Sequence, residues 1–188
     1  MNAILKEFPE VIESDRIYLR PCRREDSFAV HAAIHASQQE LKQWLAFAKT
    51  LATIEETAEN LIQSQADFIL RKDLRFLIFR KEDDVFIGST GLHRINWDIP
   101  KFEIGYWIDT QYSKQGYITE STKALTNFAF EQLGAKRIEI RCDSKNTESR
   151  RIPEKLGFSL EGILRSDSLA VDGSVRDTCI FAKTTAGS

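Results

Sequence analysis

The stretch KFEIGYWIDTQYSKQGYITES, residues 101–121, contains the pattern that decides the fold. Residues 101–109 predict a β-strand, and the polar loop that follows runs directly into a helix predicted over 117–133. Gly116 precedes this helix, where glycine permits a positive φ or a close backbone approach. The unpaired N–H groups that begin the helix would suit a pyrophosphate. A single glycine before a helix is also typical of an ordinary turn, so the loop alone does not establish an anion site.

The elements around this stretch predict one mixed α/β domain over residues 1–188, with a core over about 14–184 and short tails at both ends, including a frayed C-terminus. The three strands at 74–80, 85–95 and 101–109 predict an antiparallel meander. The other expected elements are a strand at 16–22, helices at about 28–37, 40–48 and 53–72, the helix at 117–133, a strand at 137–143, a short helix at about 147–156 and two strands around a turn at 171–174.

The helix that begins after Thr53 shows a capping-box pattern, because Glu56 stands three residues later. Its apolar positions recur near helical spacing and predict one buried face. The residues expected towards the core are Ile54, Ala58, Leu61, Ile62, Phe68 and Ile69.

Composition excludes several classes of protein. The chain has 188 residues, with 26 basic and 28 acidic side chains, a net charge of −2 and 42% hydrophobic residues. These values are typical of a globular protein and exclude a disordered chain. Because no stripe of excess Lys and Arg is present, nucleic acid is not an expected partner. No apolar run approaches the roughly 20 residues of a membrane span, and the acidic N-terminus lacks signal-peptide features.

The cysteines and histidines form no strong metal motif. The three cysteines are far apart and odd in number, which favours a reducing cytoplasm over disulfides. His31 and His35 stand four residues apart on a predicted helix, a spacing that zinc sites use, but no third ligand accompanies them. We therefore expect a cytoplasmic protein with no bound metal and with ordinary surface or packed histidines.

Several motifs occur in the order typical of one known family. The strand FEIGYWID at 102–109 and the loop QGYITES at 115–121 precede NTESRRIPEKLGF at 146–158. With the segments RIYLRP, ELKQWLAFA, IGSTGL and VDGSVRDTCIF, this set resembles the GNAT superfamily of acyl-CoA-dependent N-acyltransferases. It looks most like the RimJ/RimL branch of ribosomal-protein N-acetyltransferases. The resemblance covers nearly the whole chain.

The resemblance implies an α+β fold: a single twisted, mostly antiparallel sheet with helices on both faces. In this family the fourth and fifth strands splay apart into a V-shaped slot, and here they correspond to residues 101–109 and 137–143. The pantetheine arm of acetyl-CoA enters the slot and pairs with strand backbone. Acetyl-CoA would be a co-substrate, no metal would be needed, and a homodimer is an expectation because relatives often form one.

The resemblance also assigns the residues that would contact CoA. The loop at 112–117 would bind the pyrophosphate, with Lys114 as its best cationic side chain and Arg150 and Arg151 as alternatives. Ser113 and Ile118 depart from the family pattern, which has Gln or Arg and a small residue there, and Ile118 could narrow the approach. The residues implied are Tyr106, Trp107, Ile108, Ser113, Lys114, Gln115, Gly116, Tyr117, Ile118, Thr119, Asn146 and Ser149.

Acetyl transfer requires a neutral amine, donors for the oxyanion and a proton for the leaving thiolate. Glu103 is the leading candidate for the base, directly or through a water, although it could equally pair with a nearby surface cation. Strand alternation places it on one face with Gly105 and Trp107. Oxyanion donation is expected from a backbone N–H near Tyr106 or Trp107.

Ser149 matches the family position proposed to protonate the departing sulfur, and Asn146 matches the position that meets the pantetheine arm. Alternatively, Asn146 only caps the helix. Some relatives carry a carboxylate where Ser168 stands here, with Asp167 beside it, so a base at that position is doubtful. Pro153 removes a backbone donor from the short helix and predicts a kink beside the slot.

Three functions remain open from the sequence. The first is acetylation of the α-amine of a protein or peptide, which would need an open groove. An α-amine requires less help from a base than a lysine, because about a tenth of it is neutral at pH 7. The second is acetylation of a small amine, such as an aminoglycoside, a polyamine or an amino-acid-like metabolite, in a closed pocket with several acids. The third is a non-catalytic acyl-CoA-binding module. Acceptor contacts are expected from Trp44, Phe47 and Trp97. The alternative is core packing for the first two and a contact with a partner subunit for Trp97.

Overall fold

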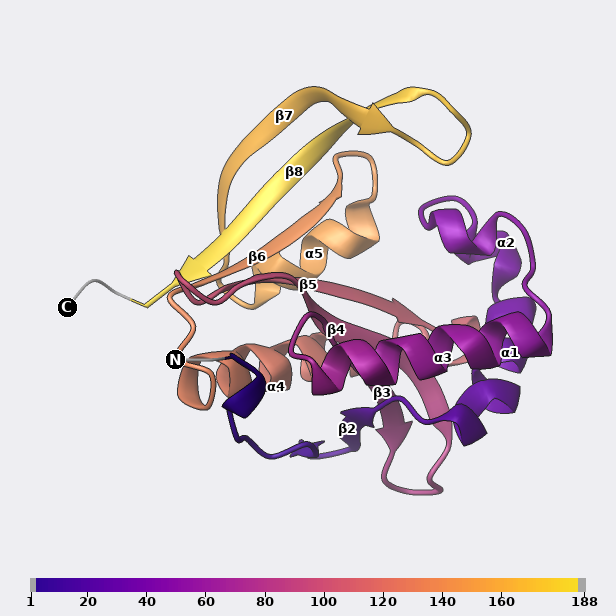
Figure 1. The fold of residues 1–188 in the computed structure, drawn as a ribbon. Helices are drawn as coiled ribbons and strands as arrows, with labels where there is room; N and C mark the ends of the chain where they lie inside the picture. The colour runs from indigo at the N-terminus through magenta and orange to yellow at the C-terminus, as the bar shows by residue number, and fades with distance from the viewer. Residues whose placement is uncertain (1–2, 186–188) are drawn as a thin grey trace.

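One mixed sheet organises the chain (Figure 1), and the computed structural model describes residues 3–185. Its strands lie in the order β1-β2-β3-β4-β5-β6-β8-β7. The strands are β1 (Ile12–Glu13), β2 (Ile17–Pro21), β3 (Leu74–Arg80), β4 (Phe86–Asn96), β5 (Lys101–Ile108), β6 (Arg137–Asp143), β7 (Ser159–Leu169) and β8 (Val175–Thr184). The helices are α1 (Ser27–Ala36), α2 (Gln38–Leu41), α3 (Ile54–Ile69), α4 (Tyr117–Glu131) and α5 (Thr147–Lys155), with 3-10 turns η1 (Ala3–Leu5), η2 (Arg24–Asp26), η3 (Ala46–Ala48) and η4 (Thr110–Tyr112).

The expected splay lies between β5 and β6. These two strands pair in parallel, and only over Lys101–Glu103 with Arg137–Glu139. Every other neighbouring pair is antiparallel. Beyond Glu103 the two strands separate, and β6, β7 and β8 rise away from the rest of the sheet (Figure 1). The backbone edge of β5 that faces β6 is therefore open from Ile104 onwards, as far as residues 3–185 show.

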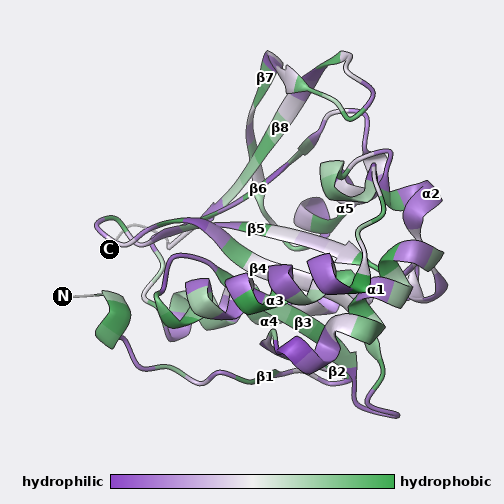
Figure 2. Cartoon of the chain, turned by 45° about the vertical axis from the view of Figure 1, so that its right-hand side comes forward, coloured by the Kyte–Doolittle hydropathy of each residue, from purple (hydrophilic) through white to green (hydrophobic). Residues whose placement is uncertain are grey.

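Helices cover both faces of the sheet and create two apolar layers. Leu77, Phe79 and Trp107 pack with α1 and α3 on one face. Phe102 and Ile104 pack with α4 on the other, larger layer. The alternation predicted for residues 102–107 is therefore confirmed. Figure 2 shows hydrophobic residues along β3 and β4, between the two helical layers.

In helix α3 the N-terminal end is fixed by a capping box, and one face is buried against the sheet. The Thr53 hydroxyl accepts from the Glu56 N–H, and the Glu56 carboxylate accepts from the Thr53 N–H at 2.8 Å, which confirms the capping box. Leu61 and Phe68 are buried, as expected. Ile62 and Ile69 were expected in the core but are 47% and 59% exposed. Each lies about 100° further round the helix than its buried neighbour, beyond the stripe that faces the sheet.

The ends of the chain differ from the expected core limits of 14 and 184. At the N-terminal end Ile12 is buried and Phe8 packs against the larger apolar layer, so the core begins earlier. At the C-terminal end Thr184 is still paired in β8. Residues 186–188, the remainder of the expected frayed tail, lie outside the described residues. Over residues 3–185, none of the helices is both long and apolar enough to cross a membrane.

Pro153 is placed inside α5 without ending it. The helix continues to Lys155, and the Pro153 side chain is buried. Proline has no N–H to give to the carbonyl four residues earlier, which belongs to Ser149. The Tyr106 hydroxyl donates to that carbonyl instead, with an Oη–O distance of 3.0 Å. The donor that α5 lacks is thus supplied by β5, across the splay.

Candidate active site

The loop between β5 and α4 exposes backbone N–H groups at the open end of the splay. Its first residue, Asp109, is buried and accepts from the Gln111 N–H at 3.0 Å and from the Ser37 hydroxyl at 3.3 Å. Lys114 and Gly116 have positive φ angles of +60° and +85°. Inside α4 the first backbone bond runs from the Glu120 N–H to the Gly116 carbonyl. The preceding amides, from Tyr117 to Thr119, therefore have no partner within the helix and can bind an anion.

The loop side chains are largely turned towards the protein itself. The Ser113 hydroxyl donates to the Thr110 carbonyl at 2.7 Å, and the Gln115 amide donates to the Gln111 carbonyl at 3.1 Å. The side chains of Tyr117 and Ile118 are buried in the larger apolar layer. Ile118 therefore points into the core and does not narrow the loop, contrary to the expectation from its size.

Two arginines beside this loop escaped the sequence analysis. Arg16, just before β2, donates to the Gln115 carbonyl at 3.1 Å and lies over the Tyr117 ring. Arg80, at the end of β3, lies over the Tyr112 ring. No sequence signal marks them, because they are far from the loop along the chain. The expected phosphate contact, Lys114, is exposed and 3.5 Å from a carboxylate oxygen of Glu148.

The far side of the splay presents Ser149 from the first turn of α5. The Asn146 side chain accepts from the Ser149 N–H at 3.0 Å, so Asn146 does cap the helix. The Ser149 hydroxyl lies 3.2 Å from the Tyr106 hydroxyl. Burial raises the Tyr106 pKa, so this phenol stays protonated near neutral pH. Burial also raises the pKa of the neighbouring Cys142 thiol, to about 11.

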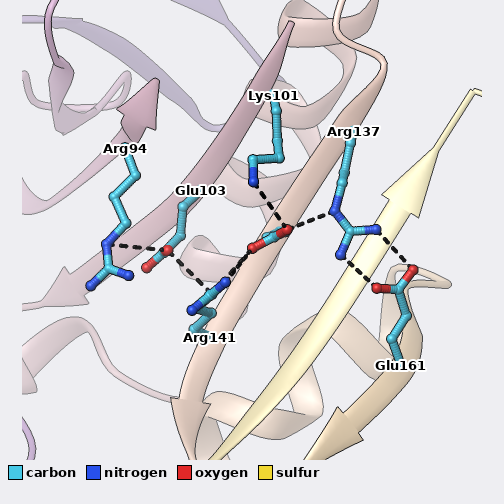
Figure 3. A network of polar contacts seen from close by, with 7 residues as sticks. Arg94, Lys101, Glu103, Arg137, Arg141 and Glu161 are labelled. Atoms are coloured by element: carbon cyan, nitrogen blue, oxygen red, sulfur yellow. Dashed lines mark hydrogen bonds and ion pairs between the residues drawn. The ribbon is translucent and has the colours of Figure 1, made fainter. Parts of the chain in front are cut away.

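Glu103 stands in an ion-pair network at the point where β5 and β6 still pair (Figure 3). Its carboxylate lies 3.5 Å from Arg94 Nε and 3.6 Å from Arg141 Nε. Arg141 and Arg137 also bond the Glu139 carboxylate, which adjoins Glu103 in the parallel pairing. The alternative role considered for Glu103, pairing with nearby cations, is therefore what this geometry shows.

A cavity of about 530 Å³ lies on the α1 and α3 face, between those helices and strands β3 to β5. Gly105 and Trp107 form part of its sheet wall, and Phe47 and His35 stand at its exposed rim. Of the expected acceptor residues, Phe47 lines this cavity and Trp44 does not. Trp97 packs edge-to-face on Phe102, on the opposite face of the sheet. Trp97 therefore lies away from this cavity, and its expected contact with an acceptor or a partner subunit stays a prediction.

Two polar groups on the sheet wall of this cavity, His93 and Arg75, were not assigned a function from the sequence. His93 on β4 faces it, and its Nδ1 is 2.7 Å from the Asp73 carboxylate. Arg75 on β3 lies beside them and bonds the neutral oxygens of Asn60, at 2.7 Å, and Ser89, at 3.2 Å. Among residues 3–185, no group of three or more His, Cys, Asp and Glu could hold a metal.

The remaining predicted positions lie apart from the cavity. Ser168 accepts from Arg176 at 2.8 Å within the β7–β8 hairpin, so it is engaged in strand pairing. Ile108 pairs with Gly88 and packs against the larger apolar layer. Arg150 donates to the Ser144 carbonyl at 3.2 Å.

The splayed sheet, the loop with unpaired amides before α4 and a cavity beside β5 are together typical of an acyltransferase of the GNAT type. A family model for the acetyltransferase (GNAT) domain matches residues 16–159, and the chain belongs to this family. It is an N-acetyltransferase that uses acetyl-CoA as its acyl donor.

Individual relatives narrow the comparison. One relative is the "Putative ribosomal N-acetyltransferase YdaF" of Bacillus subtilis (strain 168). It is 31% identical over 173 residues, which are 90% of this chain and 91% of that protein. The ribosomal-protein-serine acetyltransferase of Escherichia coli (strain K12) is 32% identical over 108 residues, 57% of this chain and 59% of that protein. Among solved structures, RimL, a ribosomal L7/L12 α-N-protein acetyltransferase in complex with CoA, superposes with a TM-score of 0.87 at 23% identity. The match covers 93% of this chain and 98% of RimL.

Proposed function

We propose that this enzyme acetylates the α-amino group at the N-terminus of a protein or peptide. The charge of the cavity is the observation that supports this choice. Within the described part of the chain, Glu56 is the one acidic residue that lines it, and its carboxylate already accepts from the Thr53 N–H. Arg75 and three histidines line the same cavity. A polyamine or an aminoglycoside, which carries several positive charges, needs several acids instead.

The proposed reaction uses the two faces of β5. The pantetheine arm of the substrate acetyl-CoA lies in the splay, along the open edge of β5, with its pyrophosphate on the amides of the 112–119 loop. The acceptor amine approaches from the cavity on the other side. The amine nitrogen bonds the carbonyl carbon and gives up one N–H proton to a base. The carbon–sulfur bond breaks, and its electron pair stays on sulfur. The Ser149 hydroxyl gives a proton to the sulfur, and solvent then returns a proton to Ser149.

The relatives supply the main alternative. A spermidine N(1)-acetyltransferase of Escherichia coli (strain K12) is 26% identical over 168 residues. A cationic acceptor of that kind is the appropriate rival to a peptide in a direct test.

The test is thiol release from acetyl-CoA with a panel of acceptors. The panel contains peptides with a free N-terminus, the same peptides with a blocked N-terminus and an internal lysine, spermidine, and an aminoglycoside. We expect turnover of the free N-termini alone. Turnover of blocked peptides, or a preference for spermidine, would overturn the proposal.

Ser149→Ala is the companion variant in that assay. We expect it to lower kcat by about 100-fold, at the low end of what general acid catalysis supplies, with an unchanged acetyl-CoA Kd by calorimetry. Ser159→Ala, at an exposed serine of β7, is the matched control and should behave as the wild type. Unchanged turnover in Ser149→Ala would remove Ser149 from the reaction.

A further inference from the structure

The cavity contains an oriented histidine beside the strand where the thioester would react. Arg75, Gly91 and Gly105 are register partners across β3, β4 and β5, and form one row of the sheet. The His93 imidazole lies over the glycines of this row. A Cβ built on Gly91 would come within 2.8 Å of His93 Nε2, and one built on Gly105 within 3.3 Å. The two glycines therefore leave the space in which the ring lies flat against the sheet.

The contacts of the ring fix its orientation and its tautomer. A carboxylate can only accept, so the 2.7 Å contact between Asp73 and Nδ1 places the neutral ring's proton on Nδ1. Nε2 then presents its lone pair. Nε2 has no hydrogen-bond partner among residues 3–185, and the ring lines the proposed acceptor cavity. Gly105, beneath the ring, immediately precedes the candidate oxyanion donors Tyr106 and Trp107.

Glu103 is the rival base and is the direct cross-strand neighbour of His93. It differs in its surroundings, because Arg94 and Arg141 both lie within 4 Å of its carboxylate. Arg94 reaches it through the irregularity of β4, where φ is +47° and the register with β5 shifts. The Glu103 carboxylate is therefore engaged by two guanidinium groups, whereas His93 Nε2 has no ion-pair partner among the described residues.

We propose that His93 is the general base of the transfer and that Asp73 positions it. As the amine nitrogen bonds the carbonyl carbon, one N–H proton passes to His93 Nε2, while the electron pair of the broken carbon–sulfur bond stays on sulfur. The imidazolium is stabilised by Asp73 and later releases its proton to solvent. Histidine suits this role because it exchanges protons near neutral pH. The inference rests on acetyl transfer to an amine and holds for any acceptor that the cavity admits.

The test measures kcat, the acetyl-CoA Kd and the melting temperature of His93→Gln and His93→Ala. We expect kcat to fall by about 100-fold, with an unchanged Kd. Added imidazole should restore part of the activity of His93→Ala, because it can occupy the space that the side chain leaves. His35→Gln is the comparison for the rescue, and imidazole should not raise its activity.

Asp73→Asn keeps the test open if the His93 variants fold poorly. We expect Asp73→Asn to lower kcat, because the neutral amide no longer stabilises the imidazolium as a charged acceptor. The loss should be smaller than in His93→Gln, because the imidazole itself remains. Asp98→Asn, at an exposed aspartate after β4, should match the wild type. Wild-type kcat in folded His93→Gln or Asp73→Asn, or a loss in His93→Ala that imidazole does not restore, would overturn the proposal. If the wild type acetylates spermidine and none of the peptides, the proposal of a peptide acceptor is wrong. The His93 and Asp73 variants, assayed with spermidine, then still test whether His93 is the general base.

Discussion

Gly116 shows how one residue conformation creates a binding surface. Its φ of +85° ends the loop and directs the first amides of α4 outward. An L-residue adopts this φ at a cost of roughly 1 kcal/mol. A Cβ at this position would meet only Arg16 Nη2, at 3.5 Å, so the cost is conformational and not steric.

We therefore expect Gly116→Ala to lower the free energy of unfolding by about 1 kcal/mol and to weaken acetyl-CoA binding. Urea denaturation and calorimetry measure the two effects. Gly162→Ala, where a Cβ meets nothing within 4 Å, is the control. An acetyl-CoA Kd equal to that of the wild type in Gly116→Ala would show that the loop conformation does not determine binding.

At the scale of elements, β5 and α5 depend on each other across the splay. The Tyr106 hydroxyl replaces the N–H that Pro153 lacks, and it also contacts the Ser149 hydroxyl. The contact therefore positions the first turn of α5, which carries Ser149, the proposed proton donor for sulfur. The sequence shows that Pro153 removes an N–H donor from α5, but only the tertiary structure shows that the Tyr106 hydroxyl replaces this donor.

A double-mutant cycle tests this dependence. We expect Tyr106→Phe to destabilise the protein by about 1 kcal/mol, because it leaves the part-buried Ser149 carbonyl unpaired. In a Pro153→Ala background the alanine N–H can bond the Ser149 carbonyl, so the same change should cost clearly less. Urea denaturation of the four proteins gives the coupling. Equal costs in both backgrounds would contradict the exchange of donors.

At the scale of the whole molecule, the two parts of the sheet are joined by a short parallel pairing and a charge network (Figure 3). Lys101 and Glu103 reach from β5 towards Glu139 and Arg141 on β6, at 3.9 Å and 3.6 Å. Burial raises the pKa of Glu139, but hydrogen bonds from Arg137 and Arg141 outweigh it, and the net pKa is lowered.

The sign of this shift predicts an acid-dependent stability. A carboxyl whose folded pKa is lowered stabilises the protein above its unfolded pKa of about 4.3, and this contribution is lost as pH falls through the folded value. Glu139→Gln should therefore lower the melting temperature at pH 7 and have a much smaller effect near pH 3. Glu59→Gln, at an exposed position on α3, is the control. A deficit that does not change with pH would assign the effect to packing.

Local patterns predicted much of this molecule. The capping box at Thr53, the strand alternation at 102–107 and the loop at Gly116 are set by neighbours along the chain, so the sequence revealed them. The cavity residues are set by register between distant strands. His93 meets Asp73 and Gly105 only because β3, β4 and β5 align, and no local pattern reports that alignment.

The sequence by itself determined the family, the order of the elements and the loop that would hold the pyrophosphate, because helix starts, strand periods and glycine positions are local properties of the chain. Tertiary structure decided which charged groups face one another. It paired Glu103 with Arg94 and Arg141, left the Nε2 of His93 unpaired and placed Trp97 on the opposite face of the sheet. It also gave the cavity beside α1 and α3 few acidic side chains. The physical reason is that the environment of a charge depends on groups brought together by folding across long sequence distances.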